Sequence, residues 1–458
     1  MTPPSESETT SSNAAVGAAG TGYLATAIML LFAAGLAARL GFVTASITVF
    51  VAGAVTLIIL AASDRITVSR RRIERTGLLS WLNTVFTGSP NRLRLAHIEQ
   101  IETTAFQRFR RGGHVSYAYR TVIRGRSARF QMSSARRGYA RLIRIVLSSV
   151  PEDVLDNRSI ELRDYFAARD DVRARARQSE IPTGDVLEES LRKSRSERRP
   201  VSRSARTSID PDKAERLRRL GNELRVAGFL LQSLEAFRRA VLLHPASGWL
   251  LFDYGRCILS CAVTEKDKKL ERRAFAMMRL AEQRAGDDAN LLAQLGESYF
   301  QAGNWNRAAV VFKKALEKVG TSFRSVRGLA EIALRDGKFA HVIHNFSLAN
   351  SLTQTRALKR WTGAEIEYFT KLNDDEEYME LEISRLSLMD TLAKLRRSML
   401  RLASAGIAVI VAGKLFSDSL VTDLGWAISS VAMIIWTGSS VFKEILSERI
   451  PINTFEEE

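Results

Sequence analysis

Residues 290–315 read NLLAQLGESYFQAGNWNRAAVVFKKA. On both sides of the Gly303-Asn304 pair, apolar residues recur at helical spacing, which predicts two amphipathic helices joined by a tight turn. Small and large side chains alternate at fixed places within this stretch, and small residues opposite large ones let two helices pack closely. The positions concerned are Leu295-Gly296, Tyr299, Gly303, Ala308, Phe312 and Ala315.

The same arrangement recurs along the chain, so the helical hairpin is one unit of a repeat. Units begin near Ala214 and at 248, 289 and 323, a spacing of 34 residues except for the second unit, which is about seven residues longer through the charged Thr264–Lys269 stretch. The first unit matches at Leu220-Gly221, Leu224, Gly228, Phe237, Ala240 and Pro245. The second matches at Gly255, Ile258, Ala274, Met278 and Ala281, and the fourth at Leu329-Ala330, Gly337, Phe346 and Ala349.

This pattern resembles the tetratricopeptide-repeat (TPR) superfamily, whose units of about 34 residues are pairs of antiparallel helices. The resemblance covers residues 210–352, and a generic helical bundle is the alternative. It implies a superhelix with a concave groove that holds a peptide or a partner helix. A degenerate fifth unit, from Ala357 through Trp361 and Tyr368, and a capping helix from about Asp374 to Arg401 account for residues 353–401.

The TPR register places twelve residues on the groove, and their arginines and aromatic rings suit an acidic, aromatic peptide. They are Arg218, Asn222, Arg225, Trp249, Phe252, Arg256, Asn290, Glu297, Phe300, Arg327, Glu331 and Arg335. In chaperone-binding TPR proteins a basic clamp grips the carboxylates at a partner's C-terminus. Arg218 and Asn222 occupy two clamp positions, but Asp253, Asn290 and Gln294 do not suit the others. We therefore expect a protein or peptide partner without a chaperone clamp.

Four apolar runs lie near the ends of the chain, at Tyr23–Ala38, Phe42–Ala62, Leu402–Phe416 and Leu424–Phe442. A helix needs about 20 such residues to cross the hydrocarbon core. We expect two transmembrane hairpins, at 22–62 and 402–442, in preference to a single span or buried core helices. A signal peptide is disfavoured because Glu6 and Glu8, and no Lys or Arg, precede the first run.

Arginines and lysines gather where these hairpins meet the middle of the chain. Arg65, Arg70, Arg71 and Arg72 follow the first hairpin, and Lys394, Arg396, Arg397 and Arg401 precede the second. By the positive-inside rule, both termini and residues 63–401 lie in the cytoplasm of a bacterial cell, under its inner membrane. Two cysteines in 458 residues agree with a reducing compartment.

Residues 65–150 carry 18 Arg and no Lys against three acids, so this segment supplies +15 of the formal net charge of +17. Alternating apolar residues predict strands at 66–68, 72–75, 93–101, 115–123 and 128–132, and residues 135–150 form an amphipathic helix. With the preceding hairpin, this pattern resembles the bacterial pleckstrin-homology-like (PH-like) membrane proteins. The resemblance implies a small, basic β domain over residues 63–165.

Three interpretations of these arginines stay open. They attract the domain to an anionic lipid surface, with Arg65, Arg70, Arg71 and Arg72 in contact. Alternatively they form a specific lipid headgroup pocket, or they bind nucleic acid, since aromatic residues such as Phe106 and Tyr117 lie among them. The first interpretation explains the pattern with the fewest assumptions, and nucleic acid is the least favoured ligand.

The remaining segments are poor in large apolar residues. We expect a disordered tail at 1–21, a flexible linker at 166–209 that allows some helix at its start, and a cytoplasmic tail at 443–458. No phosphate-binding loop, nucleophile elbow or zinc-ligand spacing occurs, so we expect no enzyme, no metal and no cofactor. Cys257 with Cys261 and His341 with His344 are best explained by packing or solvent exposure.

The sequence thus predicts a mainly α membrane protein with two transmembrane hairpins, a small β-rich PH-like domain and an α-solenoid of TPR units. Its expected function is a membrane-anchored scaffold that recruits a protein partner. The alternatives are a regulator that senses anionic lipid or the envelope state, and an auxiliary subunit of a complex for envelope polymer synthesis or export. The oligomeric state and the partner are left open.

Overall fold

The computed structural model describes residues 14–17, 21–69, 71–78, 80–81, 91–111, 114–126, 128–168, 171–196, 209–320, 322–446 and 449. These residues form two compact units. The first contains β1 and the described residues of Asp64–Ile366, and the second contains the described residues of Gly20–Ser63 and those from Glu367 onward.

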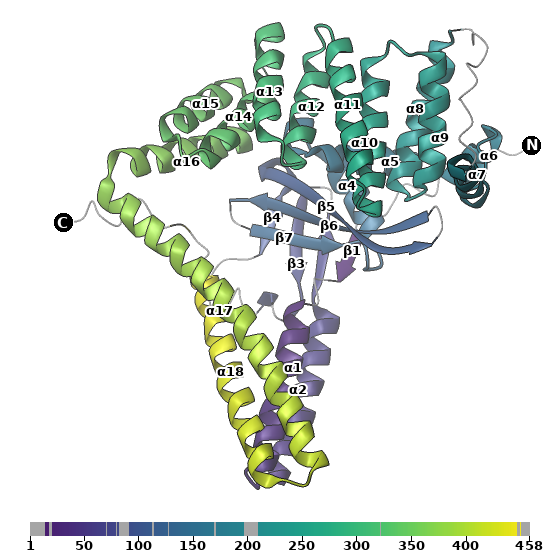
Figure 1. Ribbon diagram of the computed structural model, residues 1–458. Coiled ribbons are helices and arrows are strands. Elements are labelled where there is room, and N and C mark those ends of the chain that lie inside the picture. Colours follow the sequence, from purple (N-terminus) through teal and green to yellow (C-terminus); the bar gives the residue numbers. More distant parts are fainter. Residues whose placement is uncertain are drawn as a thin grey trace, which may run out of the picture. The chain divides into compact units, whose positions relative to one another are not determined.

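Within the first unit, the strands form two antiparallel sheets (Figure 1). The first sheet has the order β1-β2-β3-β4, with β1 at Ala14–Gly17, β2 at Arg65–Val68, β3 at Arg72–Thr76 and β4 at Arg92–Arg94. The second sheet has the order β5-β6-β7, with β5 at Ile98–Arg111, β6 at His114–Gly125 and β7 at Ala128–Ser133. The strands predicted at 66–68, 72–75, 115–123 and 128–132 correspond to β2, β3, β6 and β7. The strand predicted at 93–101 is divided into β4, a short 3-10 helix and the start of β5, and residues 102–111 of β5 were not predicted.

Helix α4 (Tyr139–Ser149) closes the core of these sheets, as its amphipathic pattern predicted. Its buried residues are Tyr139, Leu142, Ile143, Val146 and Leu147. Strand β1 was not predicted, because it lies in the stretch 1–21 that was expected to be disordered. Ala14 and Val16 are buried beside Ile66 and Val68, which explains why this short Ala-rich segment is ordered. Residues 1–13 lie outside the described residues.

Much of the stretch predicted to be a flexible linker is helical. Helix α5 (Asn157–Ala167) ends where this stretch begins, and within it α6 covers Val172–Gln178 and α7 covers Gly184–Ser196. Val172, Ala176 and Ile181 share a hydrophobic cluster with Ala214 and Leu217 of the repeats. The prediction of a tether over 166–209 is therefore wrong for this part, since three apolar residues suffice when a neighbouring surface buries them. Residues 197–208 lie outside the described residues.

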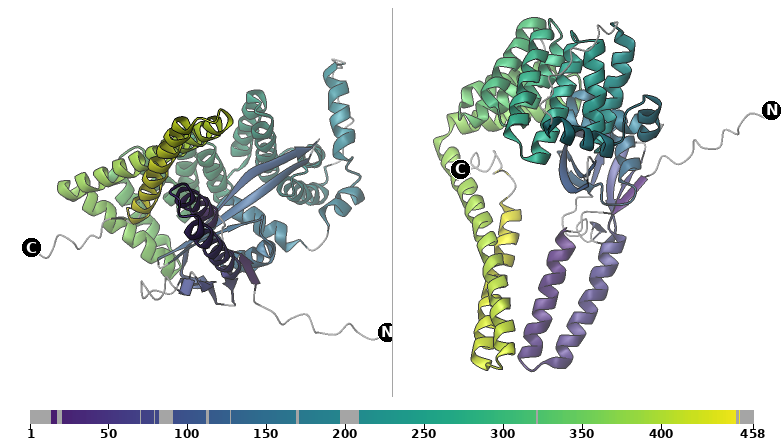
Figure 2. Two further views of the ribbon diagram at one scale, coloured as in Figure 1. Left: turned by 90° about the horizontal axis from the view of Figure 1, so that it is seen from below. Right: turned by 45° about the vertical axis from the view of Figure 1, so that its right-hand side comes forward.

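Four helix pairs and one further helix follow, side by side in Figures 1 and 2. The pairs are α8 (Pro211–Val226) with α9 (Leu230–Leu243), α10 (Gly248–Glu265) with α11 (Lys268–Arg284), α12 (Ala289–Gln301) with α13 (Trp305–Val319), and α14 (Phe323–Arg335) with α15 (Phe339–Leu352). Helix α16 covers Arg356–Asp374. The pairs begin where the repeat predicted them.

The glycines of the repeat allow the helices of a pair to touch. A Cβ atom at Gly221 would lie 2.9 Å from the ring of Phe237, and one at Gly296 would lie 2.5 Å from the ring of Phe312. The extra residues of the second unit lengthen α10 and α11 to 18 and 17 residues. Asp267 caps α11 by accepting hydrogen bonds from its first backbone amides.

The β region and the repeats share one hydrophobic core. Val226, Phe323 and Val326 of the repeats belong to the same buried cluster as the strands and α4. The segments 63–165 and 210–352, expected as separate domains, therefore bury apolar surface against each other.

The second unit is a bundle of long helices. These are α1 (Thr21–Arg39), α2 (Val43–Ser63), α17 (Glu376–Leu415) and α18 (Ser419–Ile445). Three stretches are long and apolar enough to cross a membrane: Val43–Ser63, Glu376–Leu415 and Ser419–Ser440. Helix α1 has a shorter apolar stretch, Thr26–Arg39. The predicted capping helix and the apolar run after it form a single 40-residue helix, α17, whose N-cap is Asp375.

Small residues bring α17 and α18 close together. A Cβ atom at Gly406 would lie 2.3 Å from the hydroxyl oxygen of Ser429, and one at Gly413 would lie 2.5 Å from that of Thr422. The Ser429 hydroxyl donates to the carbonyl oxygen of Ala403 at 3.2 Å. Close backbone approach and hydrogen bonds between helices are the usual means of helix association in lipid.

The turn between α8 and α9 requires a glycine at position 228. Gly228 has a φ of +90°, and a Cβ atom there would lie 1.8 Å from the carbonyl oxygen of Val115 in β6. Gly337 occupies the same turn of the fourth pair, with a φ of +71° and open space around it. We expect Gly337→Ala to cost about 1 kcal/mol of unfolding free energy, from backbone conformation alone. Gly228→Ala should cost at least about 2 kcal/mol, because it also separates β6 from the repeats.

Chemical unfolding of the detergent-solubilised chain, followed by circular dichroism, measures this difference. Equal losses for the two variants would show that β6 does not press on the turn.

Candidate functional site

Helix α5 of the chain itself lies in the groove that the repeats were expected to offer to a partner. The carboxylate of Glu161 forms ion pairs with Arg225, at 2.9 Å, and with Arg256. All three side chains are buried, with 8 % of Glu161, 4 % of Arg225 and 11 % of Arg256 exposed. Two predicted groove arginines thus share one carboxylate of α5, and this places α5 against α8 and α10.

The start of α5 is held by α12 and α14. The side-chain amide of Asn157 donates to the carbonyl oxygen of Gln294 at 3.0 Å and to the hydroxyl of Ser298 at 3.2 Å. Arg324 donates to the Asn157 side-chain oxygen at 2.7 Å and to Glu297 at 2.8 Å. It also donates to the carbonyl oxygen of Leu155 at 3.3 Å. The groove register did not include Arg324, and only its position at the first turn of a repeat helix could have indicated it.

Strand β6 reaches the first turn of the repeats. The Val115 amide donates to the carbonyl oxygen of Gly228 at 2.8 Å, and the Tyr119 hydroxyl donates to that of Val226 at 2.7 Å. Burial raises the pKa of Tyr119 above its usual range, so the hydroxyl keeps the proton that it donates. Docking of the β region on the repeats thus uses hydrogen bonds to backbone atoms of a turn.

Three cavities surround the docked helix. The α5 cavity, of about 950 Å³, lies between α5 and the helices α8, α10 and α12. It includes the predicted residues Arg218, Asn222, Trp249, Arg256 and Asn290.

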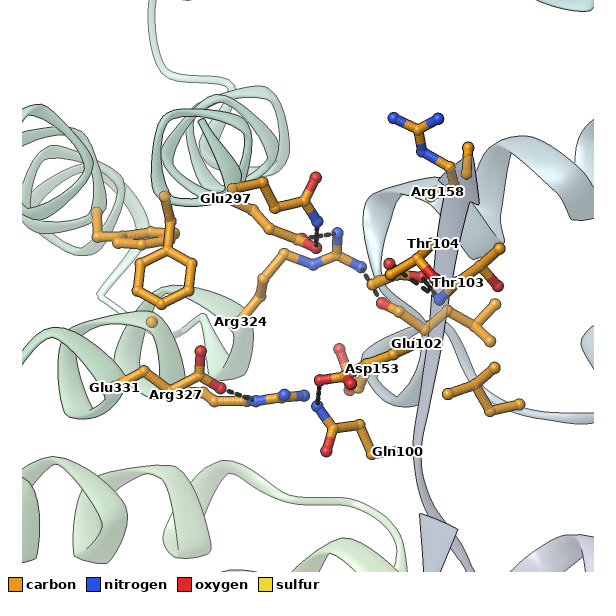
Figure 3. A pocket seen from close by; sticks show the side chains of 18 residues that line it. Gln100, Glu102, Thr103, Thr104, Asp153, Arg158, Glu297, Arg324, Arg327 and Glu331 are labelled. Carbon is orange, nitrogen blue, oxygen red and sulfur yellow. Dashed lines mark hydrogen bonds and ion pairs between the residues drawn. The ribbon is translucent and has the colours of Figure 1, made fainter. Parts of the chain in front are cut away.

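The β5 cavity, of about 420 Å³, lies between β5, α12 and α14 and includes Glu297, Phe300, Arg327 and Glu331 (Figure 3). The junction cavity, also of about 420 Å³, includes Arg225 and Arg256. Ten of the twelve predicted residues therefore face these cavities, while Phe252 and Arg335 line none of them.

Phe252 is buried in the repeat core, with the guanidinium of Arg256 above its ring at 5.1 Å. Arg335 stacks on Trp305 of α13. The prediction that Phe252 is an exposed groove aromatic is therefore wrong, because its ring fills the space between α10 and its neighbours.

The predicted groove arginines at the cavities are matched by carboxylates of the chain. Arg218 pairs with Glu215 at 2.7 Å and with Asp253, and Arg327 pairs with Glu331 at 2.9 Å. The Trp249 ring nitrogen donates to Asp288 at 2.7 Å. The groove is therefore not a row of free cations, and an acidic peptide would have to compete with carboxylates already in place.

The arginines predicted to meet the membrane lie at the first sheet. Arg65 on β2, Arg71 between β2 and β3, and Arg72 on β3 are exposed. Arg72 lies 3.4 Å from Glu74, an exposed pair that contributes little to stability. Arg70 lies outside the described residues. Membrane contact stays a prediction for all four.

The cysteines and histidines show no catalytic arrangement in the described part of the chain. Cys257 and Cys261 are buried thiols outside any disulfide, and the sulfur of Cys257 lies 3.1 Å from the Ser233 hydroxyl. His341 and His344 are exposed on α15. Among the described residues no group of three or more His, Cys, Asp or Glu side chains is placed to hold a metal ion.

No protein-family model matches the chain, and no curated protein matches it. Among solved structures it is similar to TTC0263, a thermophilic TPR protein of Thermus thermophilus, with 20 % identity and a TM-score of 0.29 over 34 % of this chain and 83 % of the other. It is also similar to Cut9-Hcn1, an APC/C hetero-tetramer, with 14 % identity and a TM-score of 0.29 over 66 % of this chain and 52 % of the other.

The helix pairs of this chain repeat one helix–turn–helix arrangement, as the sequence pattern predicted. The resemblance of residues 63–165 to PH-like domains is not confirmed.

Asp156, which caps α5, makes the stability of the folded chain depend on pH. Its carboxylate accepts hydrogen bonds from the backbone amides of Ser159 at 2.9 Å and Thr103 at 3.3 Å. Burial raises its pKa to about 6, so the folded chain binds this proton more tightly than the unfolded chain does. The unfavourable buried charge is present above pH 6 and is relieved as the pH falls from about 6 towards 4.

We therefore compare the unfolding free energy of the wild type with that of Asp156→Asn. As the pH falls from 7 to 4, the wild type should gain on the order of 2 kcal/mol relative to the variant. Unfolding of both proteins at matched pH values measures this difference, and other titrating groups cancel in the comparison. A constant difference across this range would contradict the burial of an ionisable carboxyl at the cap.

Proposed function

We propose that this chain is a membrane-anchored scaffold that recruits a protein partner at the cytoplasmic face of the membrane. The observation that carries the proposal is the α5 cavity. It measures about 950 Å³ and lies between α5 and the helices α8, α10 and α12, and it includes five of the residues that the repeat register had placed on a binding groove.

The lining of the α5 cavity suits a polar peptide or a helix with mixed charge. Arg218, Asn222 and Trp249 lie on the repeats, and Arg163 and Asp164 lie on α5 opposite them. A partner there would contact α5 as well as the repeats. Anchoring aromatic and arginine side chains are the usual sources of binding energy at such surfaces.

The bundle of α1, α2, α17 and α18 supports the anchor. Many of its large apolar side chains are exposed, which is costly in water and favourable in lipid. They include Ile47, Val51, Ile58, Ile59, Ile407, Val411, Val431 and Ile434. The basic flanks at Arg65, Arg71 and Lys394 favour a cytoplasmic position for the β region and the repeats.

A lipid-sensing regulator is the second candidate. The exposed Arg65, Arg71 and Arg72 favour it, since each basic residue near an anionic surface contributes about 1 kcal/mol of attraction. This attraction also serves a scaffold, where it orients the β region against the membrane.

The topology of the anchor is testable with single cysteines in a chain whose Cys257 and Cys261 are replaced by Ala. Ser417→Cys lies in the turn between α17 and α18, and we expect a membrane-impermeant maleimide to label it in intact spheroplasts. Ser148→Cys, exposed on α4, should be labelled only after lysis. Labelling of both in intact spheroplasts, or of neither, would refute the proposed orientation.

The groove is testable by comparing partner recovery between variants of the full chain in detergent. Arg218→Ala with Trp249→Ala removes the cation–π pair at the α5 cavity, and we expect it to reduce the recovery of the specific partner at least about tenfold. Arg272→Ala, exposed on α11 away from the cavity, is the matched control.

Partners are identified by cross-linking and mass spectrometry, and the melting temperature of each variant is compared with that of the wild type. Undiminished recovery with the double variant would exclude the α5 cavity as the recruiting surface.

A further inference from the structure

The junction between α5 and the repeats holds a concentration of buried charge. The guanidinium groups of Arg158, Arg225, Arg256 and Arg324 meet there with three carboxylates, Asp156, Glu161 and Glu297. A buried charge is expensive unless an opposite charge or several hydrogen bonds compensate it. The ion pairs within this cluster therefore show which charged group has no partner.

Three of the four guanidinium groups have partners. Arg324 pairs with Glu297 at 2.8 Å, while Arg225 and Arg256 share the carboxylate of Glu161. Asp156 is occupied as the cap of α5, where it accepts two backbone amides. No carboxylate is thus left for Arg158.

Arg158 is largely buried and, among the described residues, forms no hydrogen bond or ion pair. Figure 3 shows its guanidinium group without a bond to any of the side chains drawn around it. Burial and the nearby Arg225 lower the pKa of Arg158, and Arg158 in turn contributes to lowering the pKa of Arg256. Arg225 and Arg256 share Glu161, and Arg256 also lies 3.9 Å from Asp253, which Arg218 already pairs with. These carboxylates are therefore taken up by other arginines, and the charge of Arg158 stays uncompensated.

The junction cavity lies where these arginines converge. It includes Arg158, Arg225 and Arg256, and its uncharged polar lining residues are Gln107, Tyr117, Ser260, Thr264, Ser298 and Gln301. The Nε atom of Arg225 is a buried donor without an acceptor. Glu271 is the one acidic side chain of the lining and is exposed at the rim. The cavity thus offers an excess of positive charge and of donors, together with room for a small ligand.

We propose that the junction cavity binds a small phosphate-bearing anion, with the guanidinium group of Arg158 as its main contact. The planar fork of an arginine donates two parallel hydrogen bonds to phosphate oxygens. The β5 cavity, which Arg158 also borders, is less suited because it includes the carboxylates of Glu102, Asp153 and Glu331. The anion neutralises the charge that α5 leaves uncompensated and so strengthens the docking of α5 on α8 and α10.

The test uses the full chain in a zwitterionic detergent, with inorganic phosphate and pyrophosphate as probes and chloride at equal ionic strength as the reference. We expect saturable binding by calorimetry and a rise in melting temperature with the two phosphate compounds. Arg158→Gln should weaken binding at least about tenfold, and Arg158→Lys should weaken it less because the charge remains. Arg144→Gln, exposed on α4, is the matched control and should bind like the wild type.

A second readout separates a binding role from a structural one. Without phosphate, Arg158→Gln removes an unpaired buried charge, so we expect its melting temperature to equal or exceed that of the wild type. A lower melting temperature in chloride, or unchanged phosphate binding by Arg158→Gln, would overturn the proposal. The absence of saturable binding by the wild type would overturn it equally.

The phosphate group could belong to a soluble compound or to a lipid headgroup, and vesicles distinguish the two. Vesicles of phosphatidylcholine with phosphatidylglycerol are compared with phosphatidylcholine alone, in the presence and absence of pyrophosphate. If the anionic vesicles compete with pyrophosphate for the wild type and not for Arg158→Gln, the ligand of the site is a lipid headgroup. If the anionic vesicles leave pyrophosphate binding unchanged, the ligand is a soluble compound.

Discussion

The carboxylate of Glu161, shared by Arg225 and Arg256, is the contact on which the first unit depends. It lies between α5 and the repeats with 8 % of its side chain exposed, and an unpaired charge is costly there. Each of the three groups is buried because the other two are present. Removal of Glu161 would leave two buried guanidinium groups facing each other, and such losses typically cost about 3–5 kcal/mol.

The contact of Glu161 with Arg225 and Arg256 limits which part of the groove a partner can reach. In the arrangement implied by the repeat pattern, the concave face is empty and cationic. Here α5 covers its centre, the arginines are paired with carboxylates of the chain, and the exposed remainder is the α5 cavity beside Arg218 and Trp249. A partner of the proposed scaffold would therefore recognise a composite of the repeats and α5, so the β region takes part in recognition through the helix that follows it.

The docking of the β region combines a shared hydrophobic core with polar contacts and backbone geometry. Gly228 admits β6 only because it has no side chain, and Arg324 is bound to α5 through Asn157 and through the carbonyl oxygen of Leu155. Such contacts are directional, so they select one arrangement of the two parts. They also leave Arg158 without a partner, which is the basis for expecting an anion at the junction.

Features that depend on local pattern could be predicted from the order of the amino acids. The repeat units, the face of α4 that packs on the sheets, most strands and the apolar helices belong to this class, because each has a period or a composition of its own. Only three-dimensional packing established β1, α6 and the burial of Phe252, since Ala14, Val172 and Phe252 are ordered by distant residues. The occupation of the groove by α5 belongs with them: Glu161 and Arg256 are 95 positions apart, and only folding shows that two charges so far apart in the chain neutralise each other.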